Sequence, residues 1–283
     1  MEGRPEHPPS CTWSERLYRL RNYQSRDFWA MVFARPLTIL FLWPIADARW
    51  LSAALITWSS LACKLVGMAV LLAFPSWWGG VGGGLLINLG LVLDNMDGTL
   101  CRYRGTSTYS GYYLDKAVDI IGMAGMFAAI SLRAWWKEGN VLDVFGPFLG
   151  FAGCSVAAYC KWISHRVETD FDLLEHRKAG TLDQYVAWRV EQNPSTPPPS
   201  RTWRDWVAFF VRAARSILDF NEVDIYFFLL VALVAGREWV FTQVLCAFYA
   251  LGMVVGPAVF YVKLRRREIP PPSRETVPPR TRN

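Results

Sequence analysis

Apolar residues run along the chain in blocks of helical length that carry few charges. The segment 51–74 holds one charged residue, Lys64, and the segments 77–93, 144–160 and 239–262 hold none. A helix needs about 20 apolar residues to cross the hydrocarbon core of a bilayer. We therefore predict that each of these four segments is a transmembrane helix.

Two further apolar stretches begin with polar residues. Residues 111–132 start as GYYLDKAVD and continue as IIGMAGMFAAISL, and residues 216–236 start as SILDFNEVD and continue as IYFFLLVALVAG. With these two, the pattern predicts an all-α membrane protein with six transmembrane helices. The alternative, a soluble all-α protein with buried helices, is disfavoured because four segments are nearly free of charge.

The basic residues gather on one side of the predicted bundle. The net charge of +6 would suit either a nucleic-acid-binding protein or a membrane protein, so the placement of the charges decides. Of the 30 Lys and Arg residues, 25 lie in four segments expected on one side, namely 1–50, 101–110, 161–220 and 263–283. The opposite loops carry only Arg133, Lys137 and Arg237. The positive-inside rule then places both termini in the cytoplasm, and we expect no nucleic-acid partner.

The segments around the spans predict the domain organisation. Residues 1–50 should form a cytoplasmic N-terminus that contains an amphipathic helix at the membrane interface. Residues 51–264 should form the six-helix transmembrane domain, with a cytoplasmic helical insert at 166–220. Residues 265–283 should form a basic, Pro-rich, disordered tail that touches lipid headgroups. Membrane lipids are therefore expected partners.

Four acidic residues stand out at the junction of the second and third predicted spans. Asp94 and Asp97 are three residues apart, and Asp115 and Asp119 are four residues apart. Both spacings place the paired carboxylates on one helix face. Because the linker 101–110 is short, we expect the two helices to be antiparallel neighbours and the four carboxylates to converge near the cytoplasmic boundary of the membrane.

Four converging carboxylates need positive charge beside them. At about 4 Å and an effective dielectric constant near 20, each like-charge pair costs about 4 kcal/mol. Arg102 and Lys116 offer at most two positive charges. Two Mg²⁺ or Mn²⁺ ions would supply four, and such ions prefer carboxylate and phosphate oxygens. The alternative is that some of the acids are protonated. The spacing therefore favours a two-metal site for phosphoryl chemistry.

The same stretch resembles the signature of the CDP-alcohol phosphotransferase (CDP-alcohol phosphatidyltransferase) family, D-x2-D-G-x2-A-R-x8-G-x3-D-x3-D. Every position matches except the alanine, where this chain has Cys101, which is also small. The matching positions are Asp94, Asp97, Gly98, Arg102, Gly111, Asp115 and Asp119. The predicted six-span layout with an interfacial N-terminal helix is also similar to the family.

The resemblance implies a metal-dependent membrane transferase of phospholipid biosynthesis. It would move a substituted phosphate group from a CDP-linked alcohol to the hydroxyl of an acceptor alcohol and release CMP. Asp94, Asp97, Asp115 and Asp119 would hold the metal ions, and Asp119 would also be the catalytic base. The substrate contacts would come from Gly98, Arg102 and Gly111. The active site would face the cytoplasm, and the protein would be a homodimer.

Several alternatives compete with this interpretation. The string VLDNMDGTL is similar to the hhhhDxDGTL motif of haloacid-dehalogenase phosphatases, but Asn95 stands where that motif needs its nucleophilic aspartate. A divalent-cation transporter would also carry acids within the membrane. Against it, the acids cluster at one membrane face. A purely structural protein with an inactive motif is the third alternative, although all four acids are present.

The sequence leaves the two substrates open. One possibility is CDP-diacylglycerol with a small polar alcohol. The other is a CDP-choline or CDP-ethanolamine donor with diacylglycerol as acceptor. Both use the same motif, and we favour CDP-diacylglycerol because it is the commoner donor in the family. A GxxxG pattern at Gly252 and Gly256 is typical either of packing within one chain or of a dimer contact.

Overall fold

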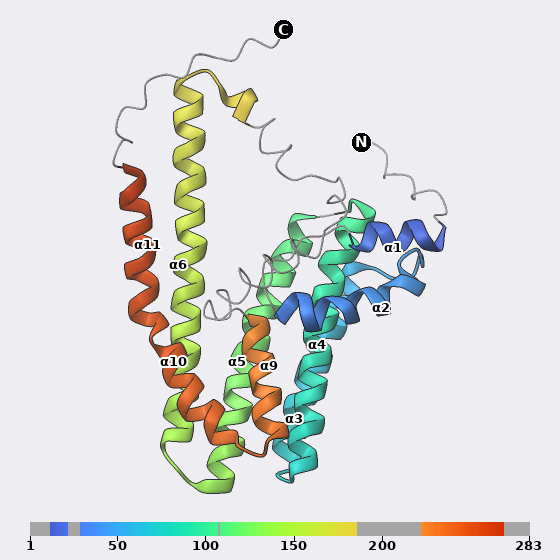
Figure 1. Ribbon diagram of the computed structural model, residues 1–283, viewed down its shortest axis with the longest axis vertical. Helices are drawn as coiled ribbons and strands as arrows, with labels where there is room; N and C mark the ends of the chain where they lie inside the picture. Colours follow the sequence, from blue (N-terminus) through green and yellow to red (C-terminus); the bar gives the residue numbers. More distant parts are fainter. Residues whose placement is uncertain (1–11, 22–28, 107, 186–221, 269–283) are drawn as a thin grey trace, which may run out of the picture. The chain divides into compact units, whose positions relative to one another are not determined.

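The computed structural model describes residues 12–21, 29–106, 108–185 and 222–268. Every regular element within these residues is a helix (Figure 1). The chain divides into two compact units, which are treated one at a time. The first contains Met1–Phe151 and Asn193–Ala247, and the second contains Ala152–Gln192 and Phe248–Asn283.

The first unit is built around the long helices α3, α4 and α5. Helix α3 packs most closely against α4 and also packs against α5, whereas α9 and α2 pack against α4. The elements of this unit are α1 (Trp13–Arg21), the π-helix η1 (Ala30–Ala34), α2 (Arg35–Ile45), α3 (Ala53–Ala73), α4 (Trp77–Arg104), α5 (Tyr109–Glu138), the beginning of α6 (Leu142–Lys178), α9 (Glu222–Val234) and the π-helix η3 (Val240–Leu245).

Local sequence signals fix the ends of the three long helices. The side chains of Ser52, Ser76 and Thr108 each accept a hydrogen bond from the backbone N–H three residues later, and so cap the N-termini of α3, α4 and α5. Helix α4 ends at Gly105, whose φ of 65° is the left-handed conformation that glycine adopts easily. The chain then re-enters α5 within a few residues, so α4 and α5 run in opposite directions (Figure 1).

The second unit pairs the later part of α6 with α11 (Gly252–Glu268), which follows the short helix α10 (Cys246–Ala250). A Cβ atom added at Gly252 would lie 2.7 Å from the carbonyl oxygen of Gly153, and one added at Gly256 would lie 3.1 Å from the Cα of Ala157. The GxxxG pattern therefore serves close packing of α11 on α6 within one chain.

Four stretches of helix are long and apolar enough to cross a membrane: Ala53–Ala73, Tyr109–Glu138, Leu142–Lys178 and Val240–Arg266. The all-α class is thus confirmed for the described residues, and four of the six predicted spans have suitable helices. Helix α4 has 28 residues, but its glycines, Asn88 and two tryptophans lower its hydropathy. The described part of α9 has only 13 residues.

The segments outside the long helices are described in part. The fourth predicted span was expected to end near residue 160, but α6 continues to Lys178 and enters the predicted insert. Helix α11 continues to Glu268, so the first residues of the predicted tail are helical. Residues 186–220 of the predicted insert and 269–283 of the predicted tail lie outside the described residues.

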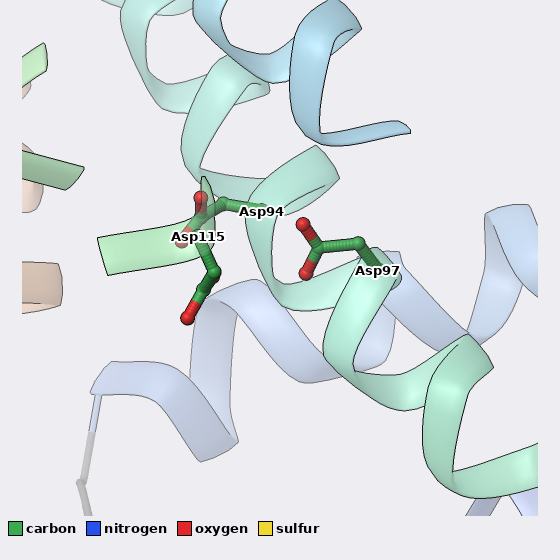
Figure 2. A group of neighbouring side chains, drawn as sticks. All are labelled: Asp94, Asp97 and Asp115. Carbon is green, nitrogen blue, oxygen red and sulfur yellow. The ribbon is translucent and has the colours of Figure 1, made fainter. Parts of the chain in front are cut away.

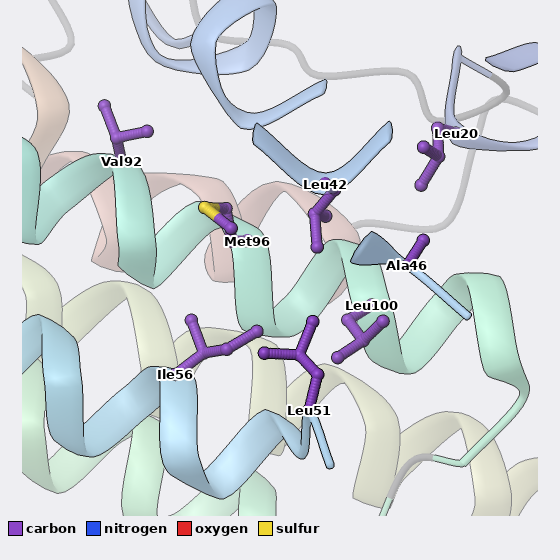
Figure 3. Close-up of a cluster of buried hydrophobic side chains, with 8 residues drawn as sticks. All are labelled: Leu20, Leu42, Ala46, Leu51, Ile56, Val92, Met96 and Leu100. Carbon is purple, nitrogen blue, oxygen red and sulfur yellow. The ribbon is translucent and has the colours of Figure 1, made fainter. Parts of the chain in front are cut away.

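A buried apolar cluster holds the N-terminal helices against the end of the bundle that carries the acidic motif (Figure 3). On α4, Val92, Met96 and Leu100 recur every four residues and therefore form one helix face. That face contacts Leu42 of α2 and Ile56 of α3. The cluster fixes α2 beside the part of α4 that carries the acidic motif.

Candidate active site

Three of the four predicted acids come together. Ligand atoms of Asp94, Asp97 and Asp115 lie within 4.8 Å of one another. Figure 2 shows that these side chains, two from α4 and one from α5, face a common space. The convergence does not come from close packing of α4 on α5, as the sequence suggested. Instead, α3 packs against both helices and sets their separation.

Asp97 is the most buried acid of the group, with 5% of its surface exposed. One of its carboxylate oxygens accepts a hydrogen bond from the Thr57 hydroxyl of α3, and the other accepts one from the backbone N–H of Gly98. These two donors fix the orientation of the carboxylate. Thr57 was not among the predicted site residues, because its role depends on contact with a helix that is 40 residues away in the sequence.

Asp119 lies between two lysines rather than in the three-carboxylate group. Its Oδ2 accepts a hydrogen bond from Lys116 Nζ at 2.7 Å, and its Oδ1 lies 4.0 Å from Lys64 Nζ. The same Lys64 Nζ lies 3.6 Å from Asp94 Oδ1. Lys64 is fully buried, whereas 58% of the Lys116 side chain is exposed. The sequence placed Lys64 in a span and gave it no role.

A cavity of about 210 Å³ opens beside the acids, and both acidic and basic side chains line it. Its lining includes Asp94, Asp97 and Asp115 together with Arg102 of α4 and Arg35 of α2. Thr38, Asn95, Gly98 and Thr99 also line it. Arg35 is a second residue that the sequence did not indicate. Its position depends on the packing of α2 against α4, where the Thr38 hydroxyl donates a hydrogen bond to the carbonyl of Val92.

The predicted substrate contacts divide into two groups. Gly98 and Arg102 line the cavity, and a Cβ atom at residue 98 would lie 3.3 Å from Arg102 Nη1, so glycine leaves room for the guanidinium group. Gly111 is exposed, does not line the cavity, and donates its backbone N–H to the cap residue Thr108.

The three-carboxylate group fits a hard divalent cation. Opposite ligands of an octahedral Mg²⁺ ion lie about 4.2 Å apart, so oxygens within 4.8 Å need only a small movement to share one ion. The oxygens belong to carboxylates, the ligand type that Mg²⁺ and Mn²⁺ prefer. The burial of Asp97 adds to the cost of leaving these charges unneutralised. The cluster and the cavity together have the chemistry of a metal-assisted phosphate site.

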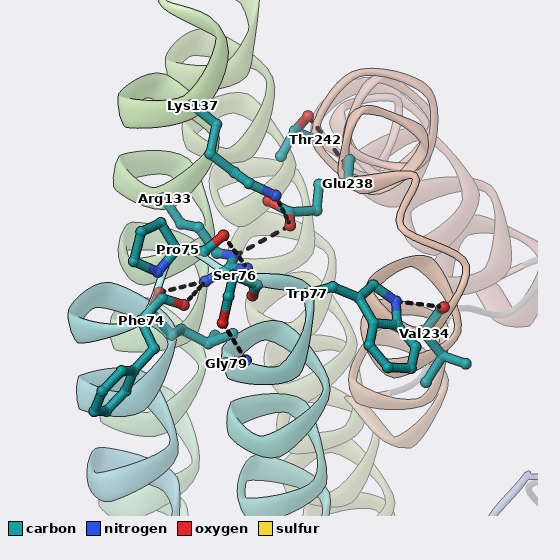
Figure 4. A network of polar contacts seen from close by, with 11 residues as sticks. Phe74, Pro75, Ser76, Trp77, Gly79, Arg133, Lys137, Val234, Glu238 and Thr242 are labelled. Carbon is teal, nitrogen blue, oxygen red and sulfur yellow. Dashed lines mark hydrogen bonds and ion pairs between the residues drawn. The ribbon is translucent and has the colours of Figure 1, made fainter.

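The opposite end of the first unit carries a second buried polar group (Figure 4). Arg133 of α5 forms an ion pair with Glu238 and donates hydrogen bonds to four backbone carbonyls at the turn between α3 and α4. Lys137 also pairs with Glu238. Nearby, Asp143 accepts hydrogen bonds from Thr242 and Gln243. Acids are therefore present at this end, contrary to the expectation from sequence, but each has donors beside it.

Fold and site define a class of protein: a helical, membrane-type protein with a three-carboxylate centre beside a cavity that suits phosphate groups. Residues 50–172 match the sequence model of the CDP-alcohol phosphatidyltransferase family, so this stretch is a domain of that family. The match confirms the resemblance seen in the motif, and it implies a transferase of a generally metal-dependent family. No curated protein sequence matches the chain significantly.

The structure also bears on the phosphatase alternative. The string around Asp94 and Asp97 lies inside α4, and the Asn95 side chain donates a hydrogen bond to the carbonyl of Leu91, one turn earlier. Asn95 therefore adds no nucleophile to the acids of this helix.

Proposed function

We propose that this protein is an integral membrane transferase that moves a substituted phosphate group from a CDP-alcohol to an acceptor hydroxyl and releases CMP. The observation that carries the proposal is that Asp94, Asp97 and Asp115 of the family domain meet beside a cavity that Arg35 and Arg102 also line. The donor we favour is CDP-diacylglycerol. The alternative with the same chemistry is CDP-choline or CDP-ethanolamine with diacylglycerol as acceptor.

The roles of the chain's residues follow from their positions. Asp94, Asp97 and Asp115 would hold Mg²⁺ or Mn²⁺, with Asp119 beside them. When bound, the cation would neutralise charge on the diphosphate and on the departing CMP. Arg35 and Arg102 would bind phosphate oxygens, since guanidinium groups suit them well. Gly98 would give the substrate close access to the backbone in the cavity, and Gly111, one turn before Asp115 on α5, would do so only for a part of the substrate that extends beyond the cavity.

Asp119 is proposed as the base. Its carboxylate would accept the proton of the acceptor hydroxyl, whose oxygen forms a bond to the β-phosphorus. The bond from that phosphorus to the oxygen bridging it to CMP then breaks, and CMP leaves with the electron pair. An ion pair weakens a carboxylate as a base, so Lys116 must turn away first. The exposure of the Lys116 side chain, 58%, permits this movement.

The proposed membrane arrangement keeps six spans, with α4 and α9 crossing beside the four apolar stretches. Helix α4 packs between α3 and α9, and exposed aromatic residues lie near both of its ends. These residues include Trp77 and Trp78 at one end and Trp50 and Tyr112 near the other, as expected at membrane interfaces. By the positive-inside rule, the basic segments favour a cytoplasmic active site and cytoplasmic termini, and α2 would lie at the interface. A homodimer remains part of the proposal.

The proposal is tested by CMP release from purified protein in lipid, with Mn²⁺ or Mg²⁺ and a panel of CDP-alcohols and acceptors. Asp97→Asn and Asp119→Asn should each lower the rate by at least about 100-fold, because they remove a cation ligand and the base. The matched control is Glu138→Gln, which changes an exposed acid at the other end of α5 and should stay within about twofold of wild type.

Two results would contradict the proposal. Undiminished turnover of Asp119→Asn would remove the proposed base. Metal uptake into liposomes without CMP release would favour the cation transporter instead. That alternative is already disfavoured by Arg133, whose buried guanidinium lies at the opposite end of the bundle, where a transported cation would have to pass.

A further inference from the structure

Arg35, which lines the cavity from the first residue of α2, is also in contact with α1. Its Nη2 donates a hydrogen bond to the backbone carbonyl of Arg21, the last residue of α1, at 2.7 Å. The last carbonyls of a helix have no partner within the helix and form the negative end of its dipole. The Arg21 carbonyl therefore orients the guanidinium group without cancelling its positive charge, as a carboxylate would.

The other end of α1 is attached to the far end of α2. Trp43 Nε1 donates a hydrogen bond to the carbonyl of Trp13 at 3.1 Å, and the two indole rings meet edge to face with their centroids 5.4 Å apart. Arg16 donates a hydrogen bond to the carbonyl of Trp43 at 3.0 Å. Because α1 begins beside the end of α2 and ends beside the start of α2, it lies antiparallel along α2 and is attached to it at both ends.

Arg16 also links α1 to the helix that carries the first two acids of the motif. Its guanidinium forms an ion pair with Asp47, and 13% of the arginine side chain is exposed. Oδ1 of Asp47 accepts a hydrogen bond from the Tyr103 hydroxyl of α4 at 2.7 Å. Leu20 of α1 is 1% exposed and belongs to the buried apolar cluster that α4 shares. These contacts fix α1 relative to α4 without the help of Arg35.

We infer that α1 is a brace that aims the Arg35 guanidinium at the cavity, and that Arg16 is the positioning residue that holds the brace. The inference rests on the proposed function for the phosphate ligand of Arg35. A guanidinium group that is already held in one direction loses less conformational freedom when it binds phosphate. Without the brace, Arg35 would keep its charge but would spend part of its time pointing away from the cavity.

The experiment measures the affinity of the purified full-length protein for CDP with Mg²⁺ by calorimetry, since CDP carries the diphosphate without a second alcohol. Arg16→Gln should weaken CDP binding about threefold, because Arg35 loses its preferred direction. The matched control is Arg19→Gln, which changes an arginine of the same helix whose ion pair with Glu15 lies within α1. It should stay within about 1.5-fold of wild type. Equal affinities of wild type and Arg16→Gln would overturn the inference.

A double-mutant cycle with Arg35→Gln separates positioning from a general loss of structure. If Arg16 acts through Arg35, its replacement costs nothing further once the Arg35 guanidinium is gone. The double variant should then bind CDP within about 1.5-fold of Arg35→Gln alone. A further threefold loss would show that the two residues act independently, and α1 would then be a packing element only.

The test does not depend on one variant, and it separates the two proposals. If Arg16→Gln fails to fold, Asp47→Asn weakens the same ion pair, keeps an acceptor for Tyr103, and should show the same loss and the same coupling to Arg35. CMP release without this coupling would refute the inference and leave the proposed function intact. CDP binding with this coupling, but without CMP release from any CDP-alcohol, would refute the proposed function and leave the role of Arg16 standing.

Discussion

Both ends of the first unit bury a cation between helices, but the two ends use it differently. At the end away from the acidic motif, all five N–H groups of Arg133 have acceptors: Glu238 and the carbonyls of Leu71, Phe74, Pro75 and Ser76. At the acidic end, Lys64 lies 3.6 Å and 4.0 Å from its two acids, beyond ordinary hydrogen-bond length.

This difference matches the tasks that the two ends would perform. Directional hydrogen bonds lock Arg133 to one arrangement, so the far end is suited to hold α3, α4, α5 and η3 together. Charge attraction is less directional, so the ion pairs of Lys64 hold the acidic end less rigidly. The balance of charge differs as well: Glu238 has two cations beside it, whereas the acidic end has more carboxylates than ammonium groups.

The largest effect should come from breaking the locked end. Arg133→Met leaves Glu238 buried with one cation fewer and removes the hydrogen-bond donors of four carbonyls. Removing one partner of a buried ion pair typically costs about 3–5 kcal/mol, and we expect a loss of stability of that size in thermal unfolding of the detergent-solubilised protein.

Lys137→Met is the control for that variant, because it removes a partly exposed lysine that pairs with the same Glu238. Lys137→Met should lower the free energy of unfolding by less than about 1 kcal/mol, as is usual for exposed ion pairs. If both variants lose the same stability, Arg133 has no special role in locking this end. A double variant, Arg133→Met with Glu238→Gln, should recover part of the loss.

The contrast between the ends also shows what the sequence can and cannot predict. The spacings of Asp94 with Asp97 and of Asp115 with Asp119 are local, and helix periodicity together with the short linker predicts that acids from two helices meet. Three of the four do so, whereas Asp119 lies beside two lysines. Lys64 and Arg35 reach the same site from α3 and α2, and their roles depend on how those helices pack. No periodicity in the sequence records such packing, so a lone charge in an apolar span gave no signal.

The predicted transmembrane spans show the same difference between features that local sequence sets and features that helix packing sets. The long charge-free blocks were recognised because membrane helices must be apolar along their length. Helix α4 is less apolar, because its glycines serve packing: a Cβ atom at Gly83 would lie 2.6 Å from Leu71 Cγ, and one at Gly90 would meet Lys64. Length and hydropathy therefore identify α3, α5 and α6 better than α4, which carries the first two acids of the motif.

A middle-sized effect should come from filling the space around the Lys64 side chain. Gly122→Ala places a methyl group 2.9 Å from Lys64 Cδ and 3.4 Å from the Tyr226 hydroxyl, so the lysine must move. Overpacking of this kind costs about 1–3 kcal/mol. We expect lower thermal stability together with a changed Mn²⁺ affinity, because the ammonium group shifts relative to Asp94 and Asp119.

The matched variant at the locked end is Gly80→Ala, whose methyl group would lie 3.0 Å from Arg133 Nη2. It should lower stability too, but leave Mn²⁺ affinity within about twofold, because Arg133 lies 18 residues, or about 27 Å, along α5 from Asp115. If Gly80→Ala alters Mn²⁺ binding as much as Gly122→Ala does, the two ends of the unit are coupled and do not have separate tasks.

The smallest effect should come from Arg35, which reaches the acidic end from α2. Arg35→Gln should raise the KM for the CDP-alcohol about threefold to tenfold and change kcat little, because a phosphate contact made equally in the ground and transition states affects binding alone. Arg49→Gln, which changes an exposed arginine that does not line the cavity, is the control and should leave both constants within about twofold. Steady-state CMP release over a range of donor concentrations separates the two constants. A fall in kcat with an unchanged KM would instead place Arg35 among the groups that act in the transition state, and α2 would then belong to the catalytic machinery rather than to donor binding.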